Sequence, residues 1–145
     1  MSKIRIHSDG ASRGNPGPSG IGVVINIDGT KKTYREFIGY ATNNEAEYKA
    51  LIFGLQKIKL LQGKTKSKKM SLECYLDSEL VVKQLNHEYK VTEENIQKLF
   101  LLLWNLATDF GAVKYFHIPR KDNSEADRLA NLALDEATRA QSRMF

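Results

Sequence analysis

Residues 3–40 decide the fold class and read KIRIHSDGASRGNPGPSGIGVVINIDGTKKTYREFIGY. At their start, isoleucines alternate with polar side chains, which is typical of a half-buried strand, and Asp9-Gly10 indicates a turn. The glycines and prolines of residues 14–20 then predict a loop. Asp28-Gly29 lies between two β-rich stretches and favours a tight antiparallel hairpin. We therefore expect the chain to open with three strands, over residues 3–9, 21–27 and 33–40.

The rest of the chain predicts four helices and two more strands. The apolar spacing becomes helical after residue 43, and two short β-rich segments interrupt it. The expected order is β-β-β-α-β-α-α-β-α, which implies an α/β fold with a mixed sheet and helices packed on its faces. The helices are expected over residues 43–61, 78–87, 93–110 and 123–140, and the strands over 70–76 and 113–118.

The length and composition predict one domain over residues 1–145, with a core of about 3–140 and a short C-terminal tail. The sequence leaves open whether Met144 and Phe145 dock on the domain. Cys74 is the only cysteine and lies in an apolar run, so we expect a buried thiol, no internal disulfide and a reducing, cytoplasmic setting. The N-terminal segment lacks an apolar stretch of signal-peptide or membrane-span length, which argues against secretion and membrane insertion.

The chain is basic, with a net charge of +5 and a pI of about 9.3. This charge is compatible with a phosphate-rich partner, because lysine and arginine release counterions when they neutralise phosphates. The densest basic run is residues 64–69, between an expected helix and an expected strand. That run could be a solvated loop or a phosphate contact, and the sequence does not choose between them.

Four acids occupy positions that the structural pattern alone does not explain. Asp9 and Asp77 each end an expected strand, where ligands of α/β sheets bind. Glu47 falls on the apolar stripe of its helix, and Asp127 heads the apolar stripe of the last helix. A structural alternative exists for each acid alone, since Asp77 or Ser78 could cap a helix and Asp127 suits a helix N-terminus.

Considered together, four carboxylates at one end of a sheet would repel each other unless cations lay between them. Oxygen ligands without histidine or cysteine suit magnesium or manganese, and therefore phosphate chemistry. The sequence lacks the motifs that other catalytic chemistries require. The sequence has no cysteine pair, no nucleophilic-serine elbow and no phosphate-binding glycine loop, and its three histidines are far apart.

Four segments resemble the signatures of the type 1 ribonuclease H family, in the family order. They are DGASRGNPG at residues 9–17, TNNEAEY at 42–48, LDSE at 76–79 and NSEADRLA at 123–130. The resemblance covers roughly residues 3–135. It implies a ribonuclease H-like fold with a five-stranded mixed sheet in the order 3-2-1-4-5 and helices on both faces.

The resemblance also implies an activity, a cofactor and a partner. Asp9, Glu47, Asp77 and Asp127 would be both the catalytic residues and the ligands of two Mg²⁺ ions, for which Mn²⁺ is a possible substitute. The chain would hydrolyse the RNA strand of RNA/DNA hybrids as a monomer, leaving 5′-phosphate and 3′-hydroxyl ends. No membrane and no protein partner is implied.

Further positions match substrate-binding residues of the family. Asn15 and Asn44 would read ribose 2′-hydroxyls, and Thr42 and Ser78 would contact the backbone. Asn15 also suits a turn before a proline, and one residue can serve both purposes.

The chain departs from the family pattern in two places. A basic protrusion found in many members is missing after the third-motif helix, so substrate affinity must come from elsewhere, such as residues 64–69 or Arg13. Many members also have a loop histidine before the last acid. A gapless alignment gives His117 that place, but His117 falls inside an expected strand, and we prefer Arg120 as a phosphate-facing residue.

Two other functions remain open at this point. One is another nuclease of the same fold, such as a reverse-transcriptase nuclease domain, a resolvase or an integrase-like strand transferase, although the asparagine motifs argue against DNA-directed enzymes. The other is a catalytically silent module that binds RNA or hybrids. The presence of all four acids argues against a silent module.

Overall fold

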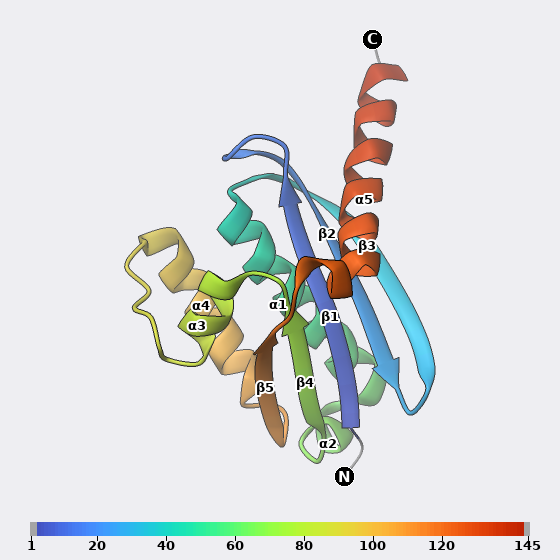
Figure 1. Cartoon of the computed structure of the whole chain (residues 1–145). Helices are drawn as coiled ribbons and strands as arrows, with labels where there is room; N and C mark the ends of the chain where they lie inside the picture. Colours follow the sequence, from blue (N-terminus) through green and yellow to red (C-terminus); the bar gives the residue numbers. More distant parts are fainter. Residues whose placement is uncertain (1–2, 144–145) are drawn as a thin grey trace.

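The computed structural model describes residues 3–143 and contains one five-stranded sheet (Figure 1). The predicted order 3-2-1-4-5 is confirmed. β1 pairs with β2, and β2 with β3, in antiparallel fashion, whereas β1 with β4 and β4 with β5 are parallel. The strands are β1 (Lys3–Ser12), β2 (Gly17–Ile27), β3 (Thr30–Ala41), β4 (Ser71–Leu76) and β5 (Ala112–His117).

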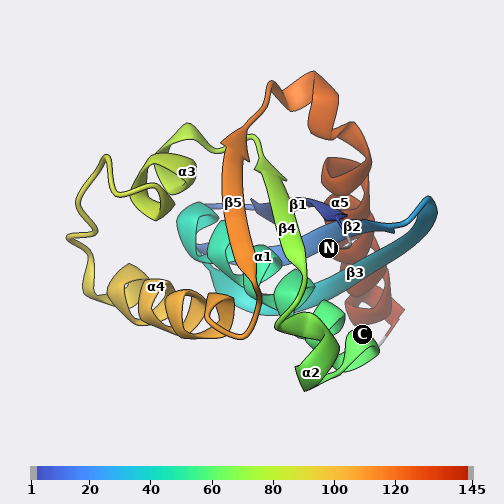
Figure 2. The ribbon, with the colours of Figure 1, turned by 90° about the horizontal axis from the view of Figure 1, so that it is seen from below.

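Helices cover both faces of this sheet (Figures 1 and 2). α1 packs on β1 and β2 and also against α4, whereas α5 packs on β2, β3 and β1 from the opposite side. None of the helices within residues 3–143 is long and apolar enough to span a membrane. The helices are α1 (Asn43–Gln62), α2 (Lys64–Ser67), α3 (Glu79–Leu85), α4 (Glu94–Ala107) and α5 (Ser124–Arg143), and η1 (Arg120–Asn123) is a 3-10 turn before α5.

The main core lies between α1 and the sheet, as the alternation of β1 predicts. Ile4 and Ile6 are fully buried there beside Tyr48 and Leu51 of α1. Cys74 belongs to the same cluster, which confirms the predicted buried thiol, and its burial raises the pKa of the thiol.

A glycine allows α5 to pack directly on β2. A Cβ atom at Gly22 would lie 2.1 Å from the carbonyl oxygen of Ala126, so any larger residue would push the helix away from the sheet. The start of α5, with Asp127, is therefore held close to the strands.

Four expectations about the elements need correction. Residues 17–20, expected in a loop, begin β2, because they pair with β3 and in part with β1. β1 continues to Ser12 instead of ending at Asp9, because it goes on pairing with β2 after its parallel pairing with β4 ends at His7. The basic run is not a loop, since residues 64–67 form α2. α5 extends to Arg143 rather than residue 140, while Met144 and Phe145 lie outside the described residues.

The basic run lies far from the carboxyl ends of β1 and β4. α2 is at the opposite end of the sheet, near the start of these strands (Figure 1). The Lys68 ammonium donates to the carbonyl oxygen of Thr108 at 2.7 Å. The run therefore supports the junction between α2, β4 and the end of α4.

Candidate active site

The fold brings the predicted acids together at the carboxyl ends of β1 and β4. Asp9 projects from β1, Glu47 from α1, and Asp77 follows β4, and one oxygen of each lies within 4.8 Å of the others. Asp127, in the first turn of α5, lines the same pocket of about 450 Å³. Four elements that are distant in the sequence therefore contribute one carboxylate each.

Glu47 is buried, and only half of its carboxylate has a protein partner. The Gly10 amide donates to its Oε1 at 3.3 Å, whereas its Oε2 has no hydrogen-bond partner among residues 3–143. A Cβ atom at Gly10 would lie 2.2 Å from the Ala46 carbonyl carbon, so this close approach of α1 to β1 requires glycine. A buried carboxylate oxygen without a donor is suited to a cation.

The crowding shifts the protonation of the cluster. Burial, together with the charge of neighbouring Glu47, raises the pKa of Asp9 to about 10. Burial raises the pKa of Glu47 to about 7, and the charge of Asp77 acts in the same direction. A divalent cation would reverse these shifts by favouring the charged forms, and the all-oxygen donor set suits a hard divalent ion. The residues present therefore fit a divalent metal site.

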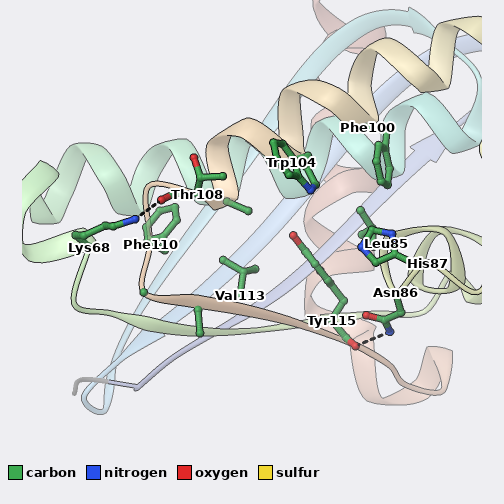
Figure 3. A pocket seen from close by; sticks show the side chains of 13 residues that line it. Lys68, Leu85, Asn86, His87, Phe100, Trp104, Thr108, Phe110, Val113 and Tyr115 are labelled. Atoms are coloured by element: carbon green, nitrogen blue, oxygen red, sulfur yellow. Dashed lines mark hydrogen bonds between the residues drawn. The ribbon is translucent and has the colours of Figure 1, made fainter.

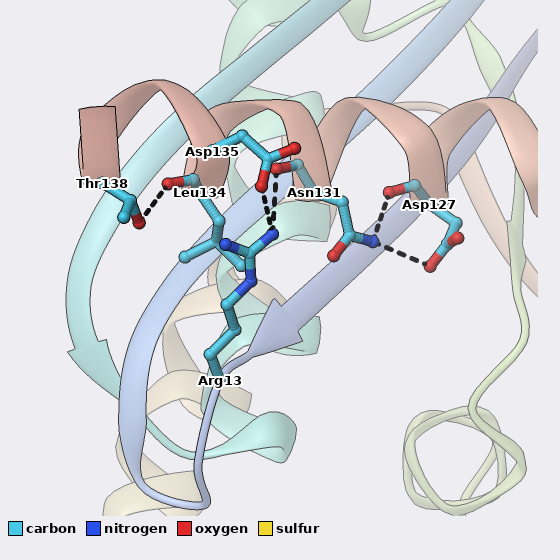
Figure 4. Close-up of polar contacts among 6 residues, drawn as sticks. All are labelled: Arg13, Asp127, Asn131, Leu134, Asp135 and Thr138. Atoms are coloured by element: carbon cyan, nitrogen blue, oxygen red, sulfur yellow. Dashed lines mark hydrogen bonds and ion pairs between the residues drawn. The ribbon is translucent and has the colours of Figure 1, made fainter. Parts of the chain in front are cut away.

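Asp127 and Asn131 of α5 form one wall of the pocket, and Arg13, which follows β1, reaches across to this helix (Figure 4). The Asn131 amide donates to the backbone oxygen of Asp127 at 3.0 Å and to its Oδ1 at 3.4 Å. Arg13 donates to Asp135 at 2.6 Å and to the carbonyl oxygen of Asn131 at 3.4 Å. The sequence offered residues 64–69 and Arg13 as sources of substrate affinity. Of these two, Arg13 borders the acids and the lysine run does not.

Arg120 lines the carboxylate pocket and His117 is not among its described lining residues. The Arg120 guanidinium lies 3.5 Å from Asp127 Oδ1, and its side chain is 81% exposed. His117 is the last residue of β5, as expected from the strand pattern. The connection between β5 and α5 contains the 3-10 turn η1, which begins at Arg120.

The four predicted substrate-binding side chains from the other motifs divide into two pairs. Asn44 and Ser78 line the pocket, whereas Asn15 and Thr42 are absent from its described lining. Asn15 accepts the backbone amide of Asn43 at 3.0 Å through Oδ1 and so joins the loop before β2 to the start of α1.

Two predicted residues have helix-capping roles. The Thr42 hydroxyl accepts the amide of Glu45 in a capping box at the start of α1. Ser78 caps α3 by accepting the amide of Val81 at 3.3 Å. Ser78, and not Asp77, is therefore the N-cap, which leaves the Asp77 carboxylate available in the pocket.

Sequence reasoning missed Asn123, the residue that holds Asp77. It is buried at the end of η1, and its amide donates to the Ser8 carbonyl oxygen at 2.9 Å and to Asp77 Oδ2 at 3.3 Å. Its only sequence signal was its position at the start of the last motif, which we interpreted as a helix start. Asn131, which is half-buried, was missed too, because a single asparagine within a helix has no distinctive pattern.

A second and larger cavity, of about 550 Å³, lies between α4 and β5 (Figure 3). Its walls are mostly apolar or aromatic and include Phe100, Trp104, Phe110 and Tyr115. Its described lining contains no carboxylate, so it lacks the acidic oxygen ligands that a hard divalent ion prefers.

The sheet order and the carboxylates from β1, α1, β4 and α5 define a protein of the ribonuclease H-like fold. A family model described as "Reverse transcriptase-like" matches residues 7–133. LC11-RNase H1, isolated from compost and solved in complex with RNA/DNA hybrid, superimposes with a TM-score of 0.87 at 39% identity, covering 93% of this chain and 99% of that one.

Curated relatives identify the family within this fold. Ribonuclease HI of Halobacterium salinarum is 39% identical over 137 residues, which are 93% of this chain and 66% of that protein. Bifunctional protein Rv2228c of Mycobacterium tuberculosis is 40% identical over 141 residues, which are 95% of this chain and 37% of that protein. This chain therefore spans little more than a third of the mycobacterial relative. The chain belongs to the type 1 ribonuclease H family.

Proposed function

We propose that this chain is a metal-dependent endoribonuclease that hydrolyses the RNA strand of RNA/DNA hybrids. The observation that carries the proposal is the cluster of Asp9, Glu47 and Asp77, whose oxygens lie within 4.8 Å in a member of this family. A relative solved in complex with RNA/DNA hybrid supports the choice of substrate.

The four carboxylates are the proposed metal ligands, with Asp9, Glu47 and Asp77 around one centre and Asp127 at its open side. Bound there, two Mg²⁺ ions, or Mn²⁺ in their place, would supply an activated water and stabilise the leaving 3′ oxygen, giving 5′-phosphate and 3′-hydroxyl ends. Asn123 fixes the Asp77 carboxylate, and the Gly10 amide fixes that of Glu47. These contacts orient the cluster before any substrate arrives.

The remaining pocket residues would recognise the strand to be cut. Asn44 would donate to a ribose 2′-hydroxyl from the pocket wall. Asn15 holds the Asn43 amide with its oxygen, so its amide nitrogen is the group that would contact a second ribose. Arg120 would exchange its exposed contact with Asp127 for a phosphate, which a guanidinium can bind in a bidentate manner.

The proposed enzyme acts as a monomer, because a single chain supplies all four acids. Its buried, lone cysteine is compatible with the reducing cytoplasm.

A cleavage assay tests this function. Labelled RNA/DNA hybrid, duplex RNA and duplex DNA of one sequence are incubated with Mg²⁺, with Mn²⁺ or with EDTA. We expect cleavage of the hybrid alone, in the presence of either metal, and products that a polymerase can extend from their 3′ ends. A DNA duplex that contains a short run of ribonucleotides should also be cut. Equal cleavage of duplex DNA would favour a DNA-directed enzyme, and tight hybrid binding without any cleavage would favour a silent module.

A further inference from the structure

The sheet face that carries Asp9 and Asp77 also carries a row of three aromatic rings. His7 of β1, Tyr75 of β4 and Phe116 of β5 are register partners. Their ring centroids are 5.0 and 5.4 Å apart, with interplanar angles of 19° and 24°. His7 and Tyr75 each precede an acid by two residues, so the row lies about 7 Å along the strands from the carboxylates.

This row is open to solvent at its β5 end. α5 covers β2, β3 and part of β1, and among residues 3–143 no helix lies in front of β4 and β5 on this face (Figure 1). β5 is an edge strand, and Phe116 is 39% exposed. The stack therefore ends in an aromatic ring that an additional flat ring can extend. Exposed aromatic residues are common, so the choice of partner depends on the charges beside them.

On the side of the row that faces away from the carboxylates, the charges are predominantly positive, whereas Asp122, Glu125 and Lys31 surround His7 at the β1 end. Arg5, Glu73 and Lys114 are register partners one step below the rings, and Lys3 lies beside them. Glu73 is the one acid among these three cations, and it lies 3.7 Å from Lys3 and 3.4 Å from Arg5. Lys114 is exposed and has no ion pair among the described residues. Aromatic rings bordered by excess cations complement a chain of bases and phosphates, whereas an apolar protein surface would leave the cations without counter-charges.

We propose that this row binds an unpaired extension of the RNA strand of the substrate. A base would stack on Phe116, and the phosphates beside it would meet Lys114 and Arg5. The assignment to RNA rests on the proposed function, because the strand that passes the carboxylates is the strand being cut. A paired strand cannot make this contact, since its bases already have their faces covered in the duplex.

Binding measurements with defined overhangs test the proposal. Fluorescence anisotropy in EDTA, which prevents cleavage, compares a blunt hybrid with hybrids that carry six unpaired nucleotides on either end of the RNA strand or of the DNA strand. We expect an RNA overhang at one end to tighten binding about five- to a hundredfold, the range for one or two stacked bases, and a DNA-strand overhang to have no effect.

Substitutions test whether the residues of the row cause the tighter binding of the overhang. Phe116→Ala should abolish the gain and leave affinity for the blunt hybrid unchanged, and Lys114→Gln should reduce the salt dependence of overhang binding by about one charge. Phe37→Ala, which removes a phenyl ring that is 48% exposed on β3, is the matched control and should keep the gain. Phe116→Leu retains apolar packing without the aromatic ring and replaces the alanine variant if thermal unfolding shows that variant to be destabilised.

The proposal is overturned if RNA overhangs do not tighten wild-type binding, if DNA-strand overhangs do so equally, or if both Phe116 variants keep the gain. Cleavage of the blunt hybrid in Mg²⁺ is scored separately. Its loss would contradict the proposed function, whereas an unchanged blunt activity without an overhang effect would contradict only the role of the aromatic row.

Discussion

The carboxylate pocket is smaller than the cavity between α4 and β5, yet the pocket is the one that contains the catalytic candidates. The α4 cavity is larger, at about 550 Å³ against 450 Å³, and its walls are mainly aromatic and aliphatic. The smaller pocket holds the acids whose pKa values burial and mutual repulsion raise. Unfavourable electrostatics, which folding alone would not select, therefore marks the chemical site better than volume does.

The largest loss of activity is expected from a substitution at Asp9 in the carboxylate pocket. Asp9→Asn keeps the shape of the side chain but removes a charge from the proposed metal site, so hydrolysis of an RNA/DNA hybrid should fall by at least about a thousandfold. Initial rates in saturating Mg²⁺ measure this loss, with circular dichroism as the check on folding. Near-normal turnover by a folded variant would remove Asp9 from the mechanism.

A second, smaller effect is expected at the exposed side of the pocket. Arg120→Ala should lower turnover about ten- to a hundredfold, the order expected for one electrostatic contact to a developing charge. His117→Ala is the matched control and should act mainly through packing in β5. Because a guanidinium stays charged, the wild-type rate should also show no loss near neutral pH from titration of a catalytic histidine. If the histidine variant loses turnover while the arginine variant is normal, the assignment of these two residues is reversed.

A third prediction concerns stability in the absence of metal. The pKa of Asp9 is raised in the folded state, so its contribution to stability is complete below its unfolded value of about 4 and is lost as pH rises toward 10. Asp9→Asn should therefore be more stable than the wild type at pH 7 in EDTA, on the order of 1–3 kcal/mol. The difference should shrink toward pH 4 and also in saturating Mg²⁺. Thermal unfolding at the two pH values measures it, and a less stable variant at pH 7 would contradict the proposed repulsion.

The smallest effect is expected in the α4 cavity. Trp104 is 53% exposed in the cavity wall, so Trp104→Ala should change hybrid cleavage by less than about twofold and lower stability by about 1 kcal/mol or less. Steady-state kinetics and thermal unfolding check both values. A large loss of turnover at unchanged stability would show that this cavity takes part in the reaction, and the contrast between the two regions would fail.

The sequence alone determined most of the fold and the four acids. Alternating isoleucines and the Asp28-Gly29 turn specified the first three strands, because side-chain alternation and turn geometry are local properties. Glu47 could be singled out because an acid on an apolar helical stripe contradicts its surroundings. The motif resemblance then supplied the strand order and the grouping of the acids.

The tertiary structure decided what depends on contacts between distant segments. The length of β1 was underestimated because β2 extends its pairing, and the lysine run was separated from the pocket only when α2 was placed at the other end of the sheet. The hydrogen bond from Asn123 to Asp77 joins residues that are 46 positions apart in the sequence. The aromatic row joins three strands. Local propensities act over a few neighbouring residues, whereas burial, carboxylate repulsion and stacking depend on distances in space that are set only when the sheet has assembled.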